Sequence, residues 1–180
     1  MYKILRNEKI SESSYLLTIK CPIVIKNAMP GQFIIVMSKE DSERIPLTIY
    51  DYNLDNGTLD LIYQVVGAST KELSENKDAV FAIIGPLGKP NEICKNYEDY
   101  KGKRIVYVAG GVGIAPVYPQ VKYLKEKGFT IDVIYGARSK DLLLIKDKIE
   151  HVASKVYYVT DDGTYGDCLL YTSPSPRDCS

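Results

Sequence analysis

The chain has 180 residues, of which 45% are hydrophobic and 26% are charged, and its basic and acidic side chains balance to a net charge of zero. This balance gives no general attraction to nucleic acid or to an anionic membrane surface. Because no apolar run approaches the roughly 20 residues of a membrane span and the N-terminal segment lacks the apolar core of a signal peptide, we expect a cytoplasmic protein without a membrane partner.

The first 100 residues have a β-rich pattern. Short runs rich in Ile, Val, Tyr and Phe are separated by turn signals, and they predict strands over 14–21, 32–38, 46–52, 59–66 and 79–84. Strands at this spacing indicate a small antiparallel β-barrel, interrupted by one short helix over 69–77. The polar segment 95–102 marks the expected boundary between a domain over 1–100 and a second domain over 101–166.

The pattern changes after residue 101, where strands alternate with helices. Strands are predicted over 104–109, 130–136 and 155–160, with helices over 115–127 and 140–150. This alternation is typical of a parallel α/β domain. Three strands make only half of a doubly wound domain, so we expect the α/β domain to be truncated. The Ser/Pro-rich segment 167–180 fits neither pattern, and we expect it to be a disordered, non-native tail.

Cysteine and histidine content argues against a metal site. Cys21, Cys94, Cys168 and Cys179 are scattered, without the close pairs typical of metal ligands. With His151 as the single histidine, the sequence predicts no zinc or iron–sulfur site built from this chain.

A glycine-rich segment, GGVGIAP (110–116), links the strand at 104–109 to the next helix. The dinucleotide fingerprint G-x-G-x-x-G would need glycine at Pro116, although proline is compatible with the first position of a helix. Glycines at the carboxyl end of a strand let a phosphate approach the backbone, and the following helix N-terminus favours an anion. The alternative interpretation is a tight turn without a ligand.

A second candidate phosphate site is the loop Gly67-Ala68-Ser69-Thr70, which precedes the short helix. Here Ser69 and Glu72 have the spacing of a capping box, which would satisfy the helix end by itself. The two interpretations can coexist.

Two further loops follow predicted parallel strands and should meet at the same sheet edge as the glycine turn. Arg138, with Ser139 and Lys140, could hold a ribose or a 2′-phosphate, and Asp161 or Asp162 could accept a hydrogen bond from a hydroxyl. Ordinary turn chemistry explains these residues equally well.

Five motifs taken in order resemble the ferredoxin–NADP reductase superfamily. They are RIPLTIYD (44–51), QVVGAST (64–70), IGPLGKP (84–90), GGVGIAPVYP (110–119) and TDDGTYG (160–166). Within that superfamily the chain is similar to electron-transfer subunits, namely that of dihydroorotate dehydrogenase and, more closely, the small (alpha) subunit of NADH-dependent ferredoxin–NADP oxidoreductase, also called the sulfide dehydrogenase beta subunit. The resemblance covers residues 1 to about 166.

The resemblance implies that the barrel holds FAD. Residues implied to run under the isoalloxazine are Ile45, Pro46, Leu47 and Thr48, with Thr48 near flavin N5 as the candidate catalytic residue, and Arg44 is a further candidate contact to the cofactor. Those implied to lie along FAD or at its pyrophosphate are Ile62, Tyr63, Gln64, Gly67, Ser69 and Thr70. The chain departs from the superfamily at Ile45, where an arginine is usual, and Arg44 would point to the opposite strand face. The pyrophosphate would then depend more on backbone N–H groups.

The α/β half is implied to bind NAD(H) or NADP(H), between which the sequence does not decide. The implied contacts are Gly110, Gly111, Gly113, Ala115 and Pro116 at the pyrophosphate and ribose, with Arg138, Asp161 and Asp162 lining the rest of the crevice. Relatives carry a [2Fe-2S] cluster on a cysteine-bearing C-terminal extension that this chain lacks, and Cys168 and Cys179 are not assigned to it.

The implied activity is that of an FAD-dependent NAD(P)H oxidoreductase subunit. Hydride would pass between nicotinamide C4 and flavin N5, and single electrons would pass on to ferredoxin or another iron–sulfur acceptor, with a catalytic partner subunit completing a heterodimer. One alternative is a nucleotide-binding regulatory module without redox chemistry. A methyltransferase using S-adenosylmethionine is disfavoured, because Asp132 begins the second α/β strand and Arg138 follows its end.

Overall fold

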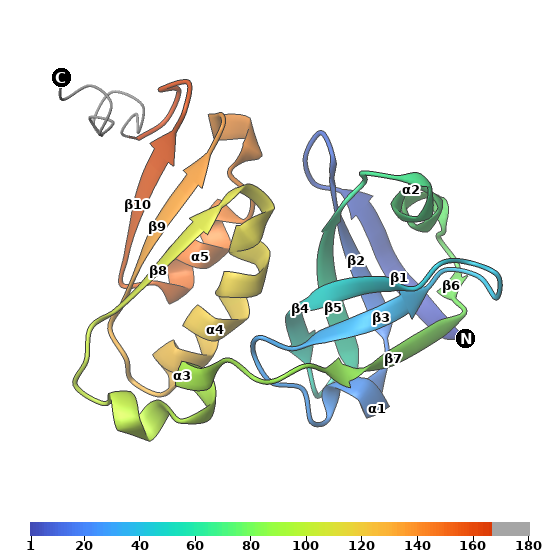
Figure 1. The fold of residues 1–180 in the computed structure, drawn as a ribbon, viewed down its shortest axis with the longest axis horizontal. Helices are drawn as coiled ribbons and strands as arrows, with labels where there is room; N and C mark the ends of the chain where they lie inside the picture. The colour runs from blue at the N-terminus through green and yellow to red at the C-terminus, as the bar shows by residue number, and fades with distance from the viewer. Residues whose placement is uncertain (167–180) are drawn as a thin grey trace, which may run out of the picture.

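The computed structural model describes residues 1–166, so the predictions for 167–180, with Cys168 and Cys179, lie outside the described residues. The N-terminal half is a nearly closed antiparallel barrel whose seven strands follow the order β6-β1-β2-β5-β4-β3-β7 (Figure 1). Its strands are β1 (Tyr2–Lys9), β2 (Ser14–Lys20), β3 (Phe33–Met37), β4 (Ile45–Asn53), β5 (Thr58–Gln64), β6 (Ala79–Val80) and β7 (Ala82–Leu87). Two helices, α1 (Pro22–Ile25) and α2 (Ala68–Glu75), close its ends.

Alternating side chains fill the barrel. Leu17 and Ile19 of β2, Ile49 of β4, and Leu59 and Leu61 of β5 are fully buried in one apolar cluster. Because inward and outward residues alternate along a strand, each of these segments also presents a solvent face. The barrel expected from the sequence is confirmed.

The sequence reading missed β1. Of its eight residues only Ile4 and Asn7 are buried, and four of the other six are charged, so the strand has no clear apolar alternation. The strand is stabilised by its partners, since it pairs with β2 along most of its length and with β6 at its start.

The C-terminal half contains a parallel sheet of order β10-β9-β8. Its elements are β8 (Ile105–Gly110), α4 (Ile114–Glu126), β9 (Ile131–Ala137), α5 (Lys146–Val152) and β10 (Lys155–Thr160). Both helices cover the sheet face that is turned toward the barrel (Figure 1). Within residues 1–166, no helix is long and apolar enough to cross a lipid bilayer.

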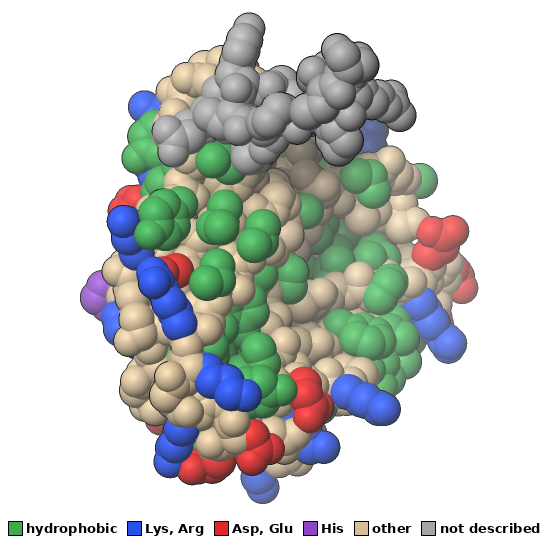
Figure 2. Space-filling model, turned by 60° about the vertical axis from the view of Figure 1, so that its left-hand side comes forward, with side chains coloured by type: hydrophobic (Ala, Val, Ile, Leu, Met, Phe, Trp, Pro, Cys, Tyr) green, Lys and Arg blue, Asp and Glu red, His purple; other side chains and the backbone are tan. Residues whose placement is uncertain are grey.

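The opposite face of this sheet carries no helix among the described residues. Val106, Val108 and Tyr157 point to it and are 51%, 71% and 40% exposed. Hydrophobic side chains are visible on this face in Figure 2. At its edge Arg104 forms an ion pair with the buried carboxylate of Asp132.

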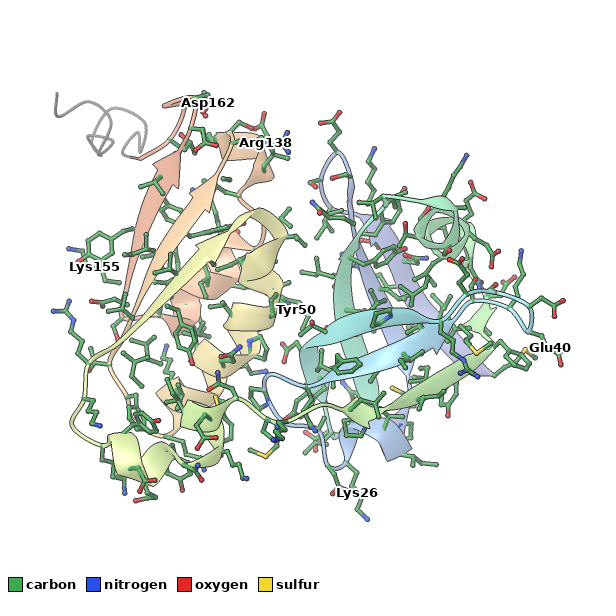
Figure 3. The ribbon with its side chains drawn as sticks, viewed as in Figure 1. Lys26, Glu40, Tyr50, Arg138, Lys155 and Asp162 are labelled. Atoms are coloured by element: carbon green, nitrogen blue, oxygen red, sulfur yellow. The ribbon has the colours of Figure 1, made fainter. Side chains whose placement is uncertain are left out.

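The two halves share an apolar seam. Tyr50 of β4 belongs to the apolar cluster of the α/β half, and its ring lies 5.0 Å from that of Tyr118 in α4. Beside this contact, Lys122 of α4 pairs with Asp51 at 2.7 Å. Tyr50 lies between the two halves in Figure 3. The seam fixes the barrel against the helices of the α/β half.

The segment 95–102 takes in the end of α3 (Glu92–Lys95) and a 3₁₀ turn over Tyr97–Tyr100, where the Asn91 side chain caps α3 and Cys94 is buried. Two local expectations were wrong. Helix α4 begins at Ile114, so Pro116 is its third residue rather than its first.

The second wrong expectation was a continuous helix over 140–150. A 3₁₀ turn covers Lys140–Leu142, and α5 starts only at Lys146. The break arises because Leu143 and Leu144 turn into the core, where the Leu144 N–H bonds to the Tyr135 hydroxyl instead of a helix carbonyl.

Candidate nucleotide-binding cleft

A cleft of about 750 Å³ lies between the barrel and the carboxyl edge of the parallel sheet. The barrel contributes Ser11, Glu12, Ser13 and Ser14 from the β1–β2 turn and Gln64 from the end of β5. The α/β half contributes Val108, Ala109, Gly110, Gly111, Val112, Ile134, Gly136, Ala137, Arg138, Leu142, Leu144, Val159 and Asp161. The carboxyl edge of a parallel sheet is the usual ligand position in α/β folds.

The glycine turn forms one wall of this cleft. Gly111 has a φ of +51°, a left-handed conformation that glycine adopts without strain. A Cβ atom at Gly110 or Gly113 would meet nothing within 4 Å, so packing does not require glycine at either position. Open backbone at a strand end is what close approach of a phosphate needs, and the residues present therefore fit a dinucleotide.

Helix α4 begins directly behind this turn. Its N-cap residue, Gly113, offers no capping side chain, and a 3₁₀ turn over Gly111–Gly113 precedes the helix, in which the Ile114 N–H donates to the Gly111 and Val112 carbonyls. The helix dipole favours an anion at this end. Ala115 and Pro116 lie in the first turn of the helix but do not line the cleft.

Arg138 and the two aspartates do not have equivalent positions. Arg138 and Asp161 line the cleft, whereas Asp162 does not. The Asp162 carboxylate accepts hydrogen bonds from the Thr164 hydroxyl (2.7 Å) and N–H (3.0 Å), which hold the pKa of Asp162 below its usual value. Figure 3 shows Arg138 and Asp162 at the same edge of the sheet. The Asp162 carboxylate thus stabilises the turn in which it lies.

Residues 44–48 do not line this cleft. Arg44 and Pro46 are exposed, Thr48 is half-buried, and Ile45 and Leu47 point into the barrel. Arg44 therefore does lie on the face opposite to Ile45. On this strand the outward face that carries Thr48 continues to Tyr50, which packs in the seam.

Ile62, Tyr63 and Gln64 have three different environments. Ile62 lines a smaller cavity of about 230 Å³ between the halves, together with Tyr50 and Lys148. Tyr63 lies inside the barrel and donates a hydrogen bond to Asn7 Oδ1 at 3.1 Å. Gln64 alone reaches the larger cleft.

The loop before α2 is capped differently from the expected capping box. Gly67 is the N-cap, and the Thr70 hydroxyl accepts from the N–H groups of Gly67 (3.1 Å) and Val66 (3.0 Å). The Ser69–Glu72 box was wrong, because the Ser69 hydroxyl donates to Glu43 and Glu72 is bonded elsewhere. This loop and the glycine turn lie at the same end of the molecule (Figure 1).

Sequence reasoning missed the β1–β2 turn and Tyr135 as parts of this region. The turn residues 11–14 carry a Ser-Glu-Ser-Ser signal, but without β1 it could not be read as a hairpin tip. Tyr135 is fully buried under the glycine turn, and only the tertiary structure brings the two together. No group of three or more potential metal ligands occurs among residues 1–166.

No protein-family model matches the chain. A search of solved structures finds the NADH-dependent reduced ferredoxin-NADP oxidoreductase, described for flavin-based electron bifurcation, with a TM-score of 0.83 and 36% identity over 96% of this chain and 60% of that one. The chain has the ferredoxin reductase-like fold. The resemblance inferred from the five motifs is thereby confirmed.

Curated relatives agree with this fold. The chain is 42% identical to the dihydroorotate dehydrogenase B (NAD(+)) electron transfer subunit homolog of Thermotoga maritima, covering 91% of this chain and 56% of the relative. It is 46% identical to an uncharacterized protein in the adh 3′ region of Clostridium beijerinckii, covering 92% of this chain and 57% of the relative. The chain therefore spans little more than half the length of these relatives.

Proposed function

We propose that the chain binds FAD on its barrel and NAD(H) in the 750 Å³ cleft, and that it passes electrons between them as the electron-transfer part of a larger oxidoreductase. The observation that carries the proposal is the glycine turn, whose open backbone faces a cleft shared by both halves although packing does not require glycine at Gly110. The ferredoxin reductase-like fold and the electron-transfer relatives support it.

NAD(H) is proposed over NADP(H) for two reasons. The Thermotoga relative is named for NAD(+) alone, whereas the name of the similar solved structure contains both NADH and NADP. In this chain the charged residues that line the cleft are Glu12, Asp161 and Arg138. The two carboxylates outnumber the one guanidinium, so the cleft has no excess positive charge to attract a 2′-phosphate.

The cofactors, when bound, supply hydride and single-electron chemistry, and the protein positions them. Backbone N–H groups at Gly110–Gly113 and the α4 dipole hold the dinucleotide pyrophosphate. Gly67, Ser69 and Thr70 hold that of FAD, and Thr48 offers its hydroxyl at the flavin edge beside the seam. The Ser69 hydroxyl donates to Glu43, so binding of FAD at this loop would require Ser69 to exchange that partner.

A catalytic partner subunit and an iron–sulfur or ferredoxin acceptor belong to the proposal, as the relatives' names suggest. The residues described do not offer ligands for a [2Fe-2S] cluster, and no step is assigned to one in this chain.

Two matched substitutions test the proposal. Gly110 and Gly67 both have extended backbones, and a Cβ at either would meet nothing within 4 Å, so alanine should leave the fold intact. Gly110→Ala places a methyl group where the dinucleotide backbone approaches and should weaken NADH binding by about tenfold or more, with FAD binding unchanged. Gly67→Ala should weaken FAD binding and leave the apparent NADH affinity of the FAD-loaded chain unchanged.

The absorbance spectrum of the purified chain, followed by anaerobic titration with NADH and NADPH, gives the readout. Flavin absorbance that NADH bleaches at lower concentration than NADPH supports the proposal. Colourless protein that cannot be loaded with FAD would instead support a nucleotide-binding module without redox chemistry. Equal effects of both alanine variants on both ligands would contradict the assignment of separate sites.

A further inference from the structure

The hydroxyl of Tyr135 connects two segments of the cleft wall. It accepts a hydrogen bond from the Leu144 N–H at 2.7 Å, and it lies 3.2 Å from the Gly111 carbonyl and 3.5 Å from the Leu142 carbonyl. A phenol has a single proton, which it can donate to one of these carbonyls or share between them. Gly111, Leu142 and Leu144 all line the cleft, whereas Tyr135 itself does not.

This hydroxyl accepts a backbone N–H that has no helix or strand carbonyl as its partner. Leu144 lies between the 3₁₀ turn and α5, and its N–H bonds to the phenol rather than to a backbone carbonyl. The side chain is fully buried, and burial raises the pKa of Tyr135 to about 12. The phenol therefore stays neutral and keeps its proton for donation across the working range of pH.

The contact with Gly111 also orients the next peptide group. A trans peptide unit is planar, with its C=O and N–H pointing in opposite directions. Holding the Gly111 carbonyl toward Tyr135 turns the N–H of Val112 away from it. The Ile114 N–H also bonds to the Gly111 carbonyl, so the phenol and this N–H together set the direction of the N–H of Val112, a residue that lines the cleft.

We propose that Tyr135 is a positioning residue for the dinucleotide, which fixes the glycine turn against the Leu142–Leu144 wall without touching the ligand. The inference rests on the proposed function, because it concerns the same cleft. It predicts a defect in nicotinamide dinucleotide binding alone, since no contact of the hydroxyl reaches the barrel.

Tyr135→Phe tests this by removing the hydroxyl and keeping the ring. On the FAD-loaded chain, the calorimetric dissociation constant for NAD⁺ should rise about three- to tenfold, as expected for one hydrogen bond. The KM for NADH with ferricyanide as acceptor should rise by the same factor, while kcat and the affinity for FAD stay unchanged. Unchanged NAD⁺ binding, or a fall in kcat without a change in KM, would overturn the proposal.

Tyr158→Phe is the matched control. Its ring lies 6.1 Å from that of Tyr135, and its hydroxyl donates to Glu150 at 2.8 Å, away from the cleft. This variant should bind NAD⁺ like the parent chain. An equal loss in both variants would show a general effect of loosening the sheet and would overturn a specific role.

Amide hydrogen exchange on the parent chain decides the matter if Tyr135→Phe does not fold. Binding of NAD⁺ should slow exchange both at Gly111–Gly113 and at Leu144, because the phenol couples them. Slowing at the glycine turn alone would overturn the proposal. If the parent chain binds FAD but not NAD⁺, or binds neither, the proposed function itself fails. If the parent chain binds NAD⁺ and the Tyr135→Phe variant binds it equally well, only the proposal for Tyr135 fails.

Discussion

Cys21 and Cys94 are the cysteines within residues 1–166, and both are free and buried. Burial disfavours the thiolate and raises the pKa of Cys21 to about 11 and that of Cys94 to about 12, from an ordinary value of 9.0. Thiols of this kind are poor nucleophiles at neutral pH, which fits a chain whose chemistry is proposed to come from cofactors.

These thiols should make the fold sensitive to alkali. Each folded-state pKa lies above the unfolded value, so the stabilising contribution is complete below pH 9 and is lost as the pH rises through about 11 and 12. Between pH 9 and pH 10 the free energy of unfolding should fall by about 1 kcal/mol for each thiol. Urea unfolding at both pH values measures this, and Cys94→Ala should remove about 1 kcal/mol of the fall, because buried tyrosines such as Tyr135, whose pKa is also raised, account for a further part of it. A fall that the variant leaves unchanged would assign the effect to other groups.

At the scale of elements, glycines with a left-handed backbone fall into two kinds. Gly31 (φ +93°) and Gly128 (φ +86°) have nearly the same conformation. A Cβ at Gly31 would lie 2.7 Å from the backbone nitrogen of Asn91, where the loop before β3 meets the start of α3, whereas one at Gly128 would meet nothing. Of these two positions, only Gly31 must be glycine because another element packs against it.

Alanine at these two positions should therefore have different costs. Gly128→Ala should lower the free energy of unfolding by about 1 kcal/mol through backbone strain. Gly31→Ala should lower it by about 2 kcal/mol more, because the Pro30–Asn91 backbone hydrogen bond must also shift. Denaturant unfolding of both variants gives the comparison. Equal losses would show that the loop relaxes freely.

Some elements could be predicted from the sequence and others could not. Strands β2 to β5 follow from the alternation of Leu17, Ile19 and their equivalents, and the glycine turn follows from its composition. Helix α5 could not be placed, because the Leu144 N–H bonds to a phenol nine residues earlier instead of continuing the helix from Lys140. Local periodicity carries no signal of such a tertiary competitor.

The candidate site shows the same limit. Gly110, Gly111, Arg138 and Asp161 were predicted at the ends of strands and do meet in one cleft. The opposite wall, residues 11–14, depends on β1, whose position is set by pairing with β2 and β6 rather than by its own pattern. Residues that line a site from a distant element are found only when the register of the sheet is known.

For the whole molecule, the uncovered sheet face is the feature that should govern behaviour in solution. Val106, Val108 and Tyr157 form an apolar surface of the kind that promotes association. Val108→Lys should reduce self-association in sedimentation velocity and leave the free energy of unfolding within about 0.5 kcal/mol, because this side chain is 71% exposed. Leu54→Lys, at a barrel residue that is 61% exposed and lies away from this sheet face, serves as control. Equal sedimentation of parent and Val108→Lys chains would contradict the prediction.

The seam between the halves has a consequence for rates. The tilted rings of Tyr50 and Tyr118 pack across it and Lys122 pairs with Asp51 beside them, so the proposed cleft has a preset width. Enzymes that close a lid over their substrate wait for that motion, and friction with the solvent slows them. With walls that are already in place, electron delivery in this chain would depend on the separation of the two ring systems and not on how viscous the surrounding fluid is.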